Sequence, residues 1–279
     1  MHCRCTIGAM ALLTAYGLAI AGAGAFDEAK YPDWKGMWTR IGPGAYDPTL
    51  PPGRGQKPPL TPEYLAIWES NLAEEAAGGQ NYNPQARCLT GGMPRMMIVY
   101  EPMEIIITPD VTYIYVGQFG DMRRIYTDGR SRPNNLEPSY VGYSIGRWID
   151  ESGSGRLDTL VVETRDLRGP RIVDASGIPL HKDNKTIVRE RIRLDRANSD
   201  VLTNEITTID NALTRPWTVT RKYRRERNPI WVEQGCGENN TYVFLDNESY
   251  FIGADGRLMP TRKDQPPPDL RHFNTLQKK

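Results

Sequence analysis

The sequence predicts a mainly β protein in which an antiparallel meander of strands closes into a barrel, with one helix near the N-terminus. Segments rich in β-branched and aromatic residues follow one another from Met96 to Gln234. Short turns such as Glu151–Gly155 and Arg196–Asp200 separate several of them, and strands joined in this way pair antiparallel. About ten such strands around one core are typical of a barrel or a sandwich.

The first 25 residues have the features of a secretory signal peptide. Arg4 lies near the start, an apolar run extends from Ile7 to Ile20, and the small residues Ala23-Gly24-Ala25 precede Phe26. The apolar run is shorter than the ~20 residues of a membrane span, and no later stretch approaches that length. We therefore expect a periplasmic or secreted protein whose mature chain has no membrane span. An uncleaved N-terminal anchor is the alternative.

Removal of that segment takes away Arg4 and leaves the formal net charge at zero instead of +1. A neutral chain is poorly suited to nucleic acid or to an anionic membrane surface, so we expect neither as a partner. Two cysteines remain, Cys88 and Cys236. In an oxidising compartment such a pair predicts a disulfide, and a catalytic thiol is the alternative.

The N-terminal part predicts a strand, a surface segment and a helix in residues 26–95. The strand covers Asp33–Arg40, and a passage rich in Pro and Gly follows from Gly42 to Pro59. Thr61 and Pro62 suit the N-cap and first position of a helix that stops at Gly78-Gly79. Its apolar stripe, which predicts a packing face, consists of Tyr64, Leu65, Trp68 and Leu72.

Residues 96–259 are expected to form the barrel, and residues 260–279 an extended tail. The predicted strands are Met96–Tyr100, Glu104–Thr108, Thr112–Val116, Arg123–Tyr126, Tyr143–Asp150, Leu157–Thr164, Thr186–Leu194, Val201–Ile209, Trp217–Tyr223 and Trp231–Gln234.

Alternation along two strands indicates which face lies inside. In Thr186–Leu194, Val188, Glu190, Ile192 and Leu194 share one face, and a row of arginines on the other face is expected to be solvated. On the last long strand one face carries an arginine among aromatic residues and is expected to point inward: Trp217, Val219, Arg221 and Tyr223.

This arrangement resembles the lipocalin and related calycin barrels. An N-terminal strand carries Gly36-Met37-Trp38, a late strand carries an inward Arg221, and hairpins connect them. In calycins the early Trp packs under an Arg from the last strand. The resemblance therefore implies contact between Trp38 and Arg221.

Several motifs also resemble a broad family of secreted bacterial proteins without a settled function. They are RRIYTDGR (Arg123–Arg130), GYSIGRW (Gly142–Trp148), TLVVET (Thr159–Thr164) and TRPWTVTR (Thr214–Arg221). Some relatives carry His at the position of Tyr143, and a shorter W-E-G-D turn where this chain has Trp148–Asp158. Both differences bear on the position of an active site. The resemblance implies a bacterial origin.

Two kinds of chemistry are disfavoured by the motifs. Gly142–Gly146 fits the G-x-S-x-G pattern of a hydrolase nucleophile, with Asp174 and His181 following, but its context is a strand that continues into a hairpin and not a strand–turn–helix. The histidines and cysteines lack metal-site spacing, and no cofactor fingerprint occurs, so we expect neither a metal nor a cofactor.

The candidate catalytic residues are His181, Glu104 and Tyr143. His181 lies in a loop and could transfer protons near neutral pH, or it could be a surface residue. A Glu104 carboxylate inside the barrel could act as a base with a raised pKa; the alternative is that it faces water or pairs with an arginine. Candidate ligand-binding residues are Tyr115, Arg124, Tyr126, Trp217 and Arg221.

Three functional hypotheses follow. The first is an enzyme, a cofactor-independent lyase or isomerase that acts on a small aromatic or hydrophobic molecule by acid/base chemistry. The second is a non-catalytic periplasmic barrel that binds such a molecule. The third, suggested only by the proline-rich segments, is a structural protein of the envelope. A binding barrel needs an apolar interior with few polar groups, whereas an enzyme needs a base within reach of its substrate.

Overall fold

The structure is a computed structural model of the whole chain. It describes residues 26–42, 57–79, 83–98, 102–117, 120–174, 176–231, 235–236, 241–245 and 248–269. The expected signal peptide, most of the Pro- and Gly-rich segment and the last ten residues lie outside the described residues.

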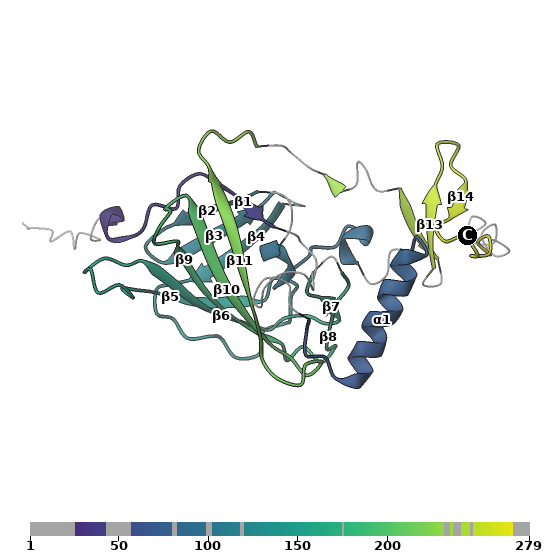
Figure 1. Cartoon of the computed structure of the whole chain (residues 1–279), viewed down its shortest axis with the longest axis horizontal. Helices are drawn as coiled ribbons and strands as arrows, with labels where there is room; N and C mark the ends of the chain where they lie inside the picture. The colour runs from purple at the N-terminus through teal and green to yellow at the C-terminus, as the bar shows by residue number, and fades with distance from the viewer. Residues whose placement is uncertain are drawn as a thin grey trace, which may run out of the picture.

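Nine strands of the described chain form a closed barrel (Figure 1). Closure comes from β1, which pairs antiparallel with both β2 and β11. All neighbours are antiparallel except β4 and β5, which are parallel because residues 127–142 cross from one end of the barrel to the other. The predicted calycin-like barrel is confirmed. In barrel order the strands are β1 (Met37–Ile41), β11 (Trp217–Glu226), β10 (Val201–Ile209), β9 (Ile187–Leu194), β6 (Thr159–Arg165), β5 (Tyr143–Ile149), β4 (Asp121–Tyr126), β3 (Val111–Val116) and β2 (Met103–Ile107).

The predicted helix is α1 (Pro62–Ala76), and it begins as the sequence indicates. The Thr61 hydroxyl accepts a hydrogen bond from the backbone N–H of Tyr64 at 3.5 Å. Tyr64 and Trp68 are buried, and the indole N–H of Trp68 donates to the carbonyl of Ser176 at 2.8 Å. Leu72, expected on the packing face, is instead exposed.

The segment Met96–Tyr100, which was predicted to be a strand, has another structure. Its described part belongs to the 3-10 helix η3 (Arg95–Ile98), so the strand prediction was wrong for Met96–Ile98. All four residues of η3 are buried, and the Tyr223 hydroxyl donates to the carbonyl of Met97. A segment surrounded on all sides can be apolar without the alternation of a strand, which is why periodicity misleads here.

Smaller elements complete the description. The 3-10 helix η1 (Glu28–Lys30) precedes β1, and the 3-10 helix η2 (Pro84–Arg87) follows α1. The short strands β7 (Arg171–Ile172) and β8 (Pro179–Leu180) pair with each other. A further sheet contains β12 (Tyr242–Leu245), β13 (Glu248–Ile252) and β14 (Leu258–Pro260).

The β12–β14 sheet lies on the side of α1 that faces away from the barrel (Figure 1). An ion pair of 3.8 Å between Arg262 and Glu74 connects it to α1. The sequence placed residues up to 259 in the barrel, whereas the last barrel strand ends at Glu226. Because β1 already pairs on both sides, the closed barrel offers no free edge to a later strand.

Cys88 and Cys236 form the predicted disulfide, with their Cα atoms 5.5 Å apart. The bond joins the end of η2 to the segment after the barrel. In the chain-entropy model a closed loop of this length contributes up to about 5 kcal/mol to the free energy of unfolding.

The predicted alternation also holds. On β9, Val188, Glu190 and Ile192 are buried while Arg189 is exposed. On β11 the buried face contains Trp217, Val219, Arg221, Tyr223 and Arg225.

Candidate functional site

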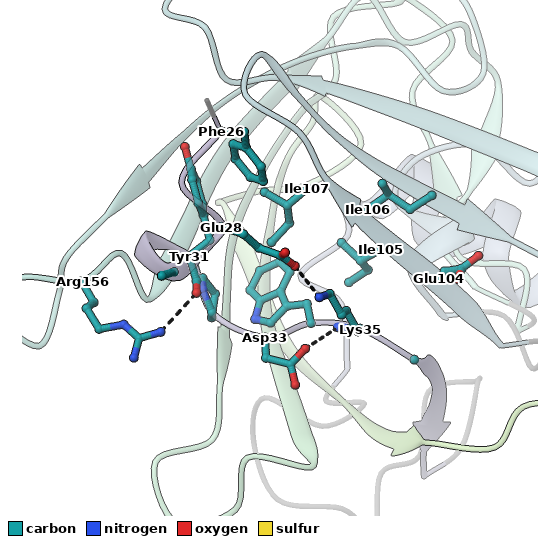
Figure 2. Close-up of a pocket in the computed structure, with 14 residues that line it drawn as sticks. Phe26, Glu28, Tyr31, Asp33, Lys35, Glu104, Ile105, Ile106, Ile107 and Arg156 are labelled. Carbon is teal, nitrogen blue, oxygen red and sulfur yellow. Dashed lines mark hydrogen bonds and ion pairs between the residues drawn. The ribbon is translucent and has the colours of Figure 1, made fainter. Parts of the chain in front are cut away.

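A pocket of about 680 Å³ lies at the rim of the barrel, between the N-terminal segment 26–36 and strand β2 (Figure 2). Its volume falls within the range of small-molecule sites in proteins. It is lined by Phe26, Glu28, Ala29, Tyr31, Pro32, Asp33, Trp34, Lys35, Gly36, Glu104, Ile105, Ile106, Ile107 and Arg156.

Aromatic rings form one side of this pocket. The ring centroids of Phe26 and Tyr31 are 5.1 Å apart, and Tyr31 meets Trp148 edge to face at 5.5 Å. Trp34 is buried against Trp148 at 4.7 Å, and Trp148 itself supports these rings without lining the pocket. Across the pocket, Ile107 of β2 adds aliphatic surface. The site therefore has the apolar character that an aromatic ligand requires.

Charged groups surround this apolar region. Lys35 Nζ and Glu28 Oε1 are 2.5 Å apart, and this contact raises the pKa of the Lys35 amine. Asp33 accepts a hydrogen bond from the backbone N–H of Lys35 at 3.1 Å, and Arg156 donates to the carbonyl of Tyr31 at 3.4 Å. Because these groups are exposed, they contribute little to stability and serve mainly to make the opening polar.

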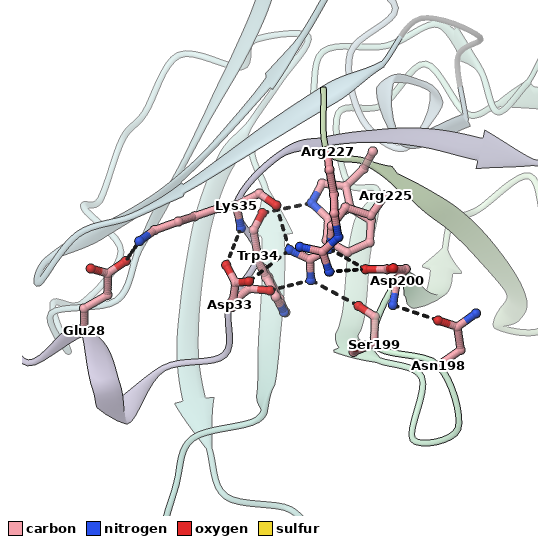
Figure 3. A network of polar contacts seen from close by, with 10 residues as sticks. Glu28, Asp33, Trp34, Lys35, Asn198, Ser199, Asp200, Arg225 and Arg227 are labelled. Atoms are coloured by element: carbon pink, nitrogen blue, oxygen red, sulfur yellow. Dashed lines mark hydrogen bonds and ion pairs between the residues drawn. The ribbon is translucent and has the colours of Figure 1, made fainter. Parts of the chain in front are cut away.

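Arg225 fastens the N-terminal segment to the barrel (Figure 3). Its guanidinium donates to the carbonyl of Lys35 at 2.7 Å and to that of Asp33 at 2.6 Å. On the other side it donates to the carbonyl of Ser199 at 3.1 Å and lies 3.1 Å from the carboxylate of Asp200. One buried side chain thus joins the pocket wall to the β9–β10 hairpin.

The same arginine stacks on Trp38. The guanidinium carbon of Arg225 is 4.5 Å from the Trp38 ring, and the indole N–H of Trp38 donates to the carbonyl of Trp34 at 3.0 Å. The Trp–Arg contact expected from the calycin resemblance is therefore present, but with Arg225 instead of Arg221. The pairing register explains the correction, because Trp38 lies opposite Arg225 on β11.

Gly36 turns the chain from the pocket wall into β1. Its φ of +100° is a conformation that residues with a side chain rarely adopt, and a Cβ there would lie 3.0 Å from the carbonyl oxygen of Glu226. This explains why a glycine precedes Met37 and Trp38 at the start of β1.

Glu104 lines this pocket but does not face the barrel interior. On β2 the buried positions are Met103 and Ile105, so Glu104 points outward and is exposed. The hypothesis of an inward carboxylate is not supported, because strand alternation assigns the inner face to its neighbours. Tyr126 was expected on a strand next to that of Glu104, but it lies on β4, and β3 separates β4 from β2.

The other two candidate catalytic residues lie elsewhere. His181 follows β8, with its Nδ1 3.1 Å from Asp183 and its ring 5.4 Å from Tyr64 of α1. Tyr143, at the start of β5, stacks on Tyr126 at 4.9 Å. Neither lines the pocket. The structure therefore does not bring the predicted catalytic residues together.

The candidate ligand-binding residues divide into two groups. Trp217 and Arg221 are buried on the inner face of β11, as expected. Burial lowers the pKa of Arg221, and the nearby Asp174 opposes this shift. The other three candidates are on β3 and β4, where their neighbours along the strand are buried, so their own side chains point outward. They are Tyr115, Arg124 and Tyr126.

The barrel interior holds a polar cluster that sequence reasoning missed. Arg123 and Glu190 form a fully buried ion pair. Arg123 also donates to Ser144 at 3.0 Å and to Thr164 at 2.8 Å, while the side-chain amide of Asn204 donates to Glu190 at 2.9 Å. One feature of the sequence could have indicated this cluster: Glu190 shares its strand face with apolar residues, so its carboxylate needs a buried partner. Ser144 lies within β5 and is hydrogen-bonded there, so it is not a nucleophile at a strand–helix turn.

A second buried cluster lies where η3 meets the β7–β8 hairpin. Arg95 donates to the carbonyl of Asp174 at 2.7 Å and to Gln85 at 2.6 Å. Burial lowers the pKa of Arg95 to about 10 and raises that of Asp174. The carboxylate of Asp174 accepts from the hydroxyl of Ser176 at 2.6 Å. These contacts hold η3 against the loop between β7 and β8 and against η2.

The fold and the pocket define a calycin-like barrel with an amphipathic site at its rim. Comparison with protein-family models found no match, and neither did comparison with curated proteins. The resemblance to secreted bacterial proteins therefore stays a prediction.

Two further results concern the described residues. They contain no group of three or more His, Cys, Asp or Glu side chains placed to hold a metal ion. They also contain no helix that is long and apolar enough to cross a membrane. The disulfide is compatible with an oxidising compartment outside the cytoplasm.

Proposed function

We propose that this protein binds a small aromatic or otherwise apolar molecule in the pocket between residues 26–36 and β2, in the periplasm or outside the cell. The observation that carries the proposal is the group of aromatic rings that line the pocket, Phe26, Tyr31 and Trp34, inside a polar rim. Ligand sites in proteins commonly combine apolar walls with a few polar groups. The scattered positions of His181, Glu104 and Tyr143 favour binding over catalysis.

Binding can be tested with N-phenyl-1-naphthylamine, a neutral aromatic probe whose fluorescence rises in apolar sites. We expect saturable binding to the folded protein. Phe26→Ala should weaken it roughly 2- to 12-fold, because one aromatic contact contributes about 0.5–1.5 kcal/mol. Phe251→Ala is a matched control, since Phe251 is also half-buried and has one ring neighbour, Tyr242 at 4.7 Å, but lies in the β12–β14 sheet.

Equal loss of affinity in both variants would show that the probe binds elsewhere or nonspecifically. Absence of saturable binding of any aromatic probe to the intact protein would contradict the proposed function.

Glu104 supports a second candidate function, the acid/base lyase or isomerase. Of the three candidate catalytic residues, it alone lines the pocket. A carboxylate there could remove a proton from the carbon next to a carbonyl group of a bound ligand. The negative charge would then develop on the carbonyl oxygen, and Lys35 and Arg156 line the same pocket as cations.

This candidate predicts that replacement of Glu104, but not of His181 or Tyr143, lowers the rate of proton transfer. With 2-tetralone in D₂O, proton exchange at the carbon next to the carbonyl should be faster with the protein than without it. Glu104→Gln should lower that rate by about 10²–10⁴-fold, the typical effect of losing a general base. His181→Ala and Tyr143→Phe should leave it unchanged. Exchange no faster than in buffer would contradict the enzyme hypothesis and leave the binding function intact.

A further inference from the structure

The outer face of β2, β3 and β4 carries a row of apolar and aromatic side chains. The pairing register sets Glu104, Tyr115 and Met122 side by side in one row. The next row contains Ile106, Tyr113 and Arg124. Ile106 is 49% exposed and Met122 is 45% exposed, which are high values for apolar residues in the middle of a sheet. We call these six residues the β2–β4 face.

The segment after β11 extends this surface. Trp231 contacts Tyr115 with a centroid distance of 4.9 Å and is 37% exposed. Its neighbour Ile230 is 84% exposed. Single exposed apolar residues are common, but several next to one another on a soluble protein usually mark a surface that another molecule covers.

Two charges of opposite sign occupy opposite corners of the face. Glu104 stands on β2 in the first row, and Arg124 stands on β4 in the second. Both are exposed, and neither forms an ion pair with a described residue; Arg124 only lies over the ring of Tyr113 at 5.9 Å. Tyr113 and Tyr115 of β3 lie between the two charges, and Ile106 and Met122 occupy the other two corners.

We propose that the β2–β4 face binds a second copy of this chain about a two-fold axis. Such a contact requires a patch that is complementary to itself. One anion and one cation at opposite corners meet this requirement, because a two-fold axis between them sets Glu104 of each copy against Arg124 of the other. Tyr113 and Tyr115, with Trp231 packed on Tyr115, then form the centre of the contact, and Ile106 and Met122 extend its apolar surface to the other two corners. An anionic membrane would instead require an excess of basic residues, which a face with balanced charge lacks.

The proposal is independent of the pocket's function. The face borders the pocket through Glu104 and Ile106, but self-association is measured here without any ligand. A failure of probe binding and a failure of dimer formation are therefore separate results.

Sedimentation velocity of the protein with its disulfide intact, over a range of micromolar concentrations, provides the first test. We expect reversible conversion from the mass of one chain to that of two. Glu104→Arg and Arg124→Glu should each weaken the dimer at least about tenfold, because each sets like charges against each other twice. Arg147→Glu is the control, since Arg147 is an exposed residue of β5 outside the face.

Charge exchange provides the second test. The double variant Glu104→Arg/Arg124→Glu should dimerise like the wild type, because both pairs are reversed together. A mixture of the two single variants should form a mixed dimer, since one chain then carries two cations and the other two anions at the corners. Circular dichroism confirms that each variant is folded.

Three results would overturn the proposal: a wild type that stays monomeric at every concentration, single variants that dimerise as well as Arg147→Glu, or a double variant that does not recover. A monomer that sediments with phosphatidylglycerol vesicles would assign the face to a membrane surface instead.

Discussion

At the scale of single residues, the ion pair of Arg123 and Glu190 is the most consequential feature of the barrel interior. Both side chains are fully buried, and three neutral groups, Ser144, Thr164 and Asn204, form hydrogen bonds with them. Taking two charges out of water is costly, and the pair is tolerated because each charge is matched. Loss of one partner leaves the other charge buried and unpaired.

We therefore expect Arg123→Met and Glu190→Gln each to lower the free energy of unfolding by about 3–5 kcal/mol. The double variant Arg123→Met/Glu190→Leu should lose less than the sum, because no unpaired charge remains. Urea denaturation measures all three. As a control, Arg189→Met should cost at most about 1 kcal/mol, since Arg189 pairs with Glu163 at the surface. Single-variant losses as small as that of the control would contradict the prediction.

At the scale of elements, the hairpin between β5 and β6 is held by carboxylates. Asp158 accepts hydrogen bonds from the backbone N–H groups of Glu151 at 3.0 Å and Ser152 at 2.9 Å, and from the Thr159 hydroxyl at 2.8 Å. Desolvation opposes ionisation here, but these hydrogen bonds prevail and lower the pKa of Asp158 to about 2. A carboxyl whose pKa falls on folding stabilises the protein above its unfolded pKa.

The stabilisation by Asp158 should accordingly be complete above about pH 4 and disappear as the pH falls toward 2. Asp158→Asn should lower the melting temperature at pH 7, and the gap to the wild type should close between pH 4 and pH 2. Thermal unfolding over this range is the measurement. Asp110→Asn, in the exposed turn between β2 and β3, controls for the change in net charge. A gap that stays constant down to pH 2 would refute the role of the Asp158 carboxylate.

At the scale of the whole molecule, the disulfide joins two regions that are 148 residues apart. It connects η2, before the barrel's second strand, to the segment that leads from the barrel to the β12–β14 sheet. Arg87 of η2 also lies over the ring of Phe244 at 4.2 Å, so the two regions meet at more than one point.

Cys88→Ala/Cys236→Ala should lower the free energy of unfolding by about 2–5 kcal/mol, because the unfolded chain gains freedom when so long a loop opens. Chemical denaturation measures the loss. Reductant should bring the wild type to the stability of the variant and leave the variant unchanged. A thiol assay on unfolded, unreduced wild type should find no thiols after removal of residues 1–25. Two thiols per chain would rule out the disulfide.

Much of the architecture follows from local patterns. Strand β10 occupies the predicted Val201–Ile209, and the N-cap of α1 is the predicted Thr61. Glu190 and Arg221 lie on the faces that alternation assigned to them. The disulfide was predictable because two cysteines remain after residue 25. Each of these predictions depends on a period, a cap or a count, which are properties of short stretches of chain.

The candidate site depended on tertiary structure. Alternation gives the side of a strand on which a residue lies, but not which distant residue stands opposite. It could not show that Arg225, and not Arg221, meets Trp38, or that Arg123 meets Glu190. The pocket exists because Arg225 holds residues 33–35 beside β2, in contacts that span 190 residues of sequence. The sequence by itself thus determined most strands of the barrel, the helix and the inward faces of β9 and β11, because local sterics and burial set them. The residues that meet at the candidate site were decided by the pairing register between distant strands. That register is fixed only when the whole barrel closes.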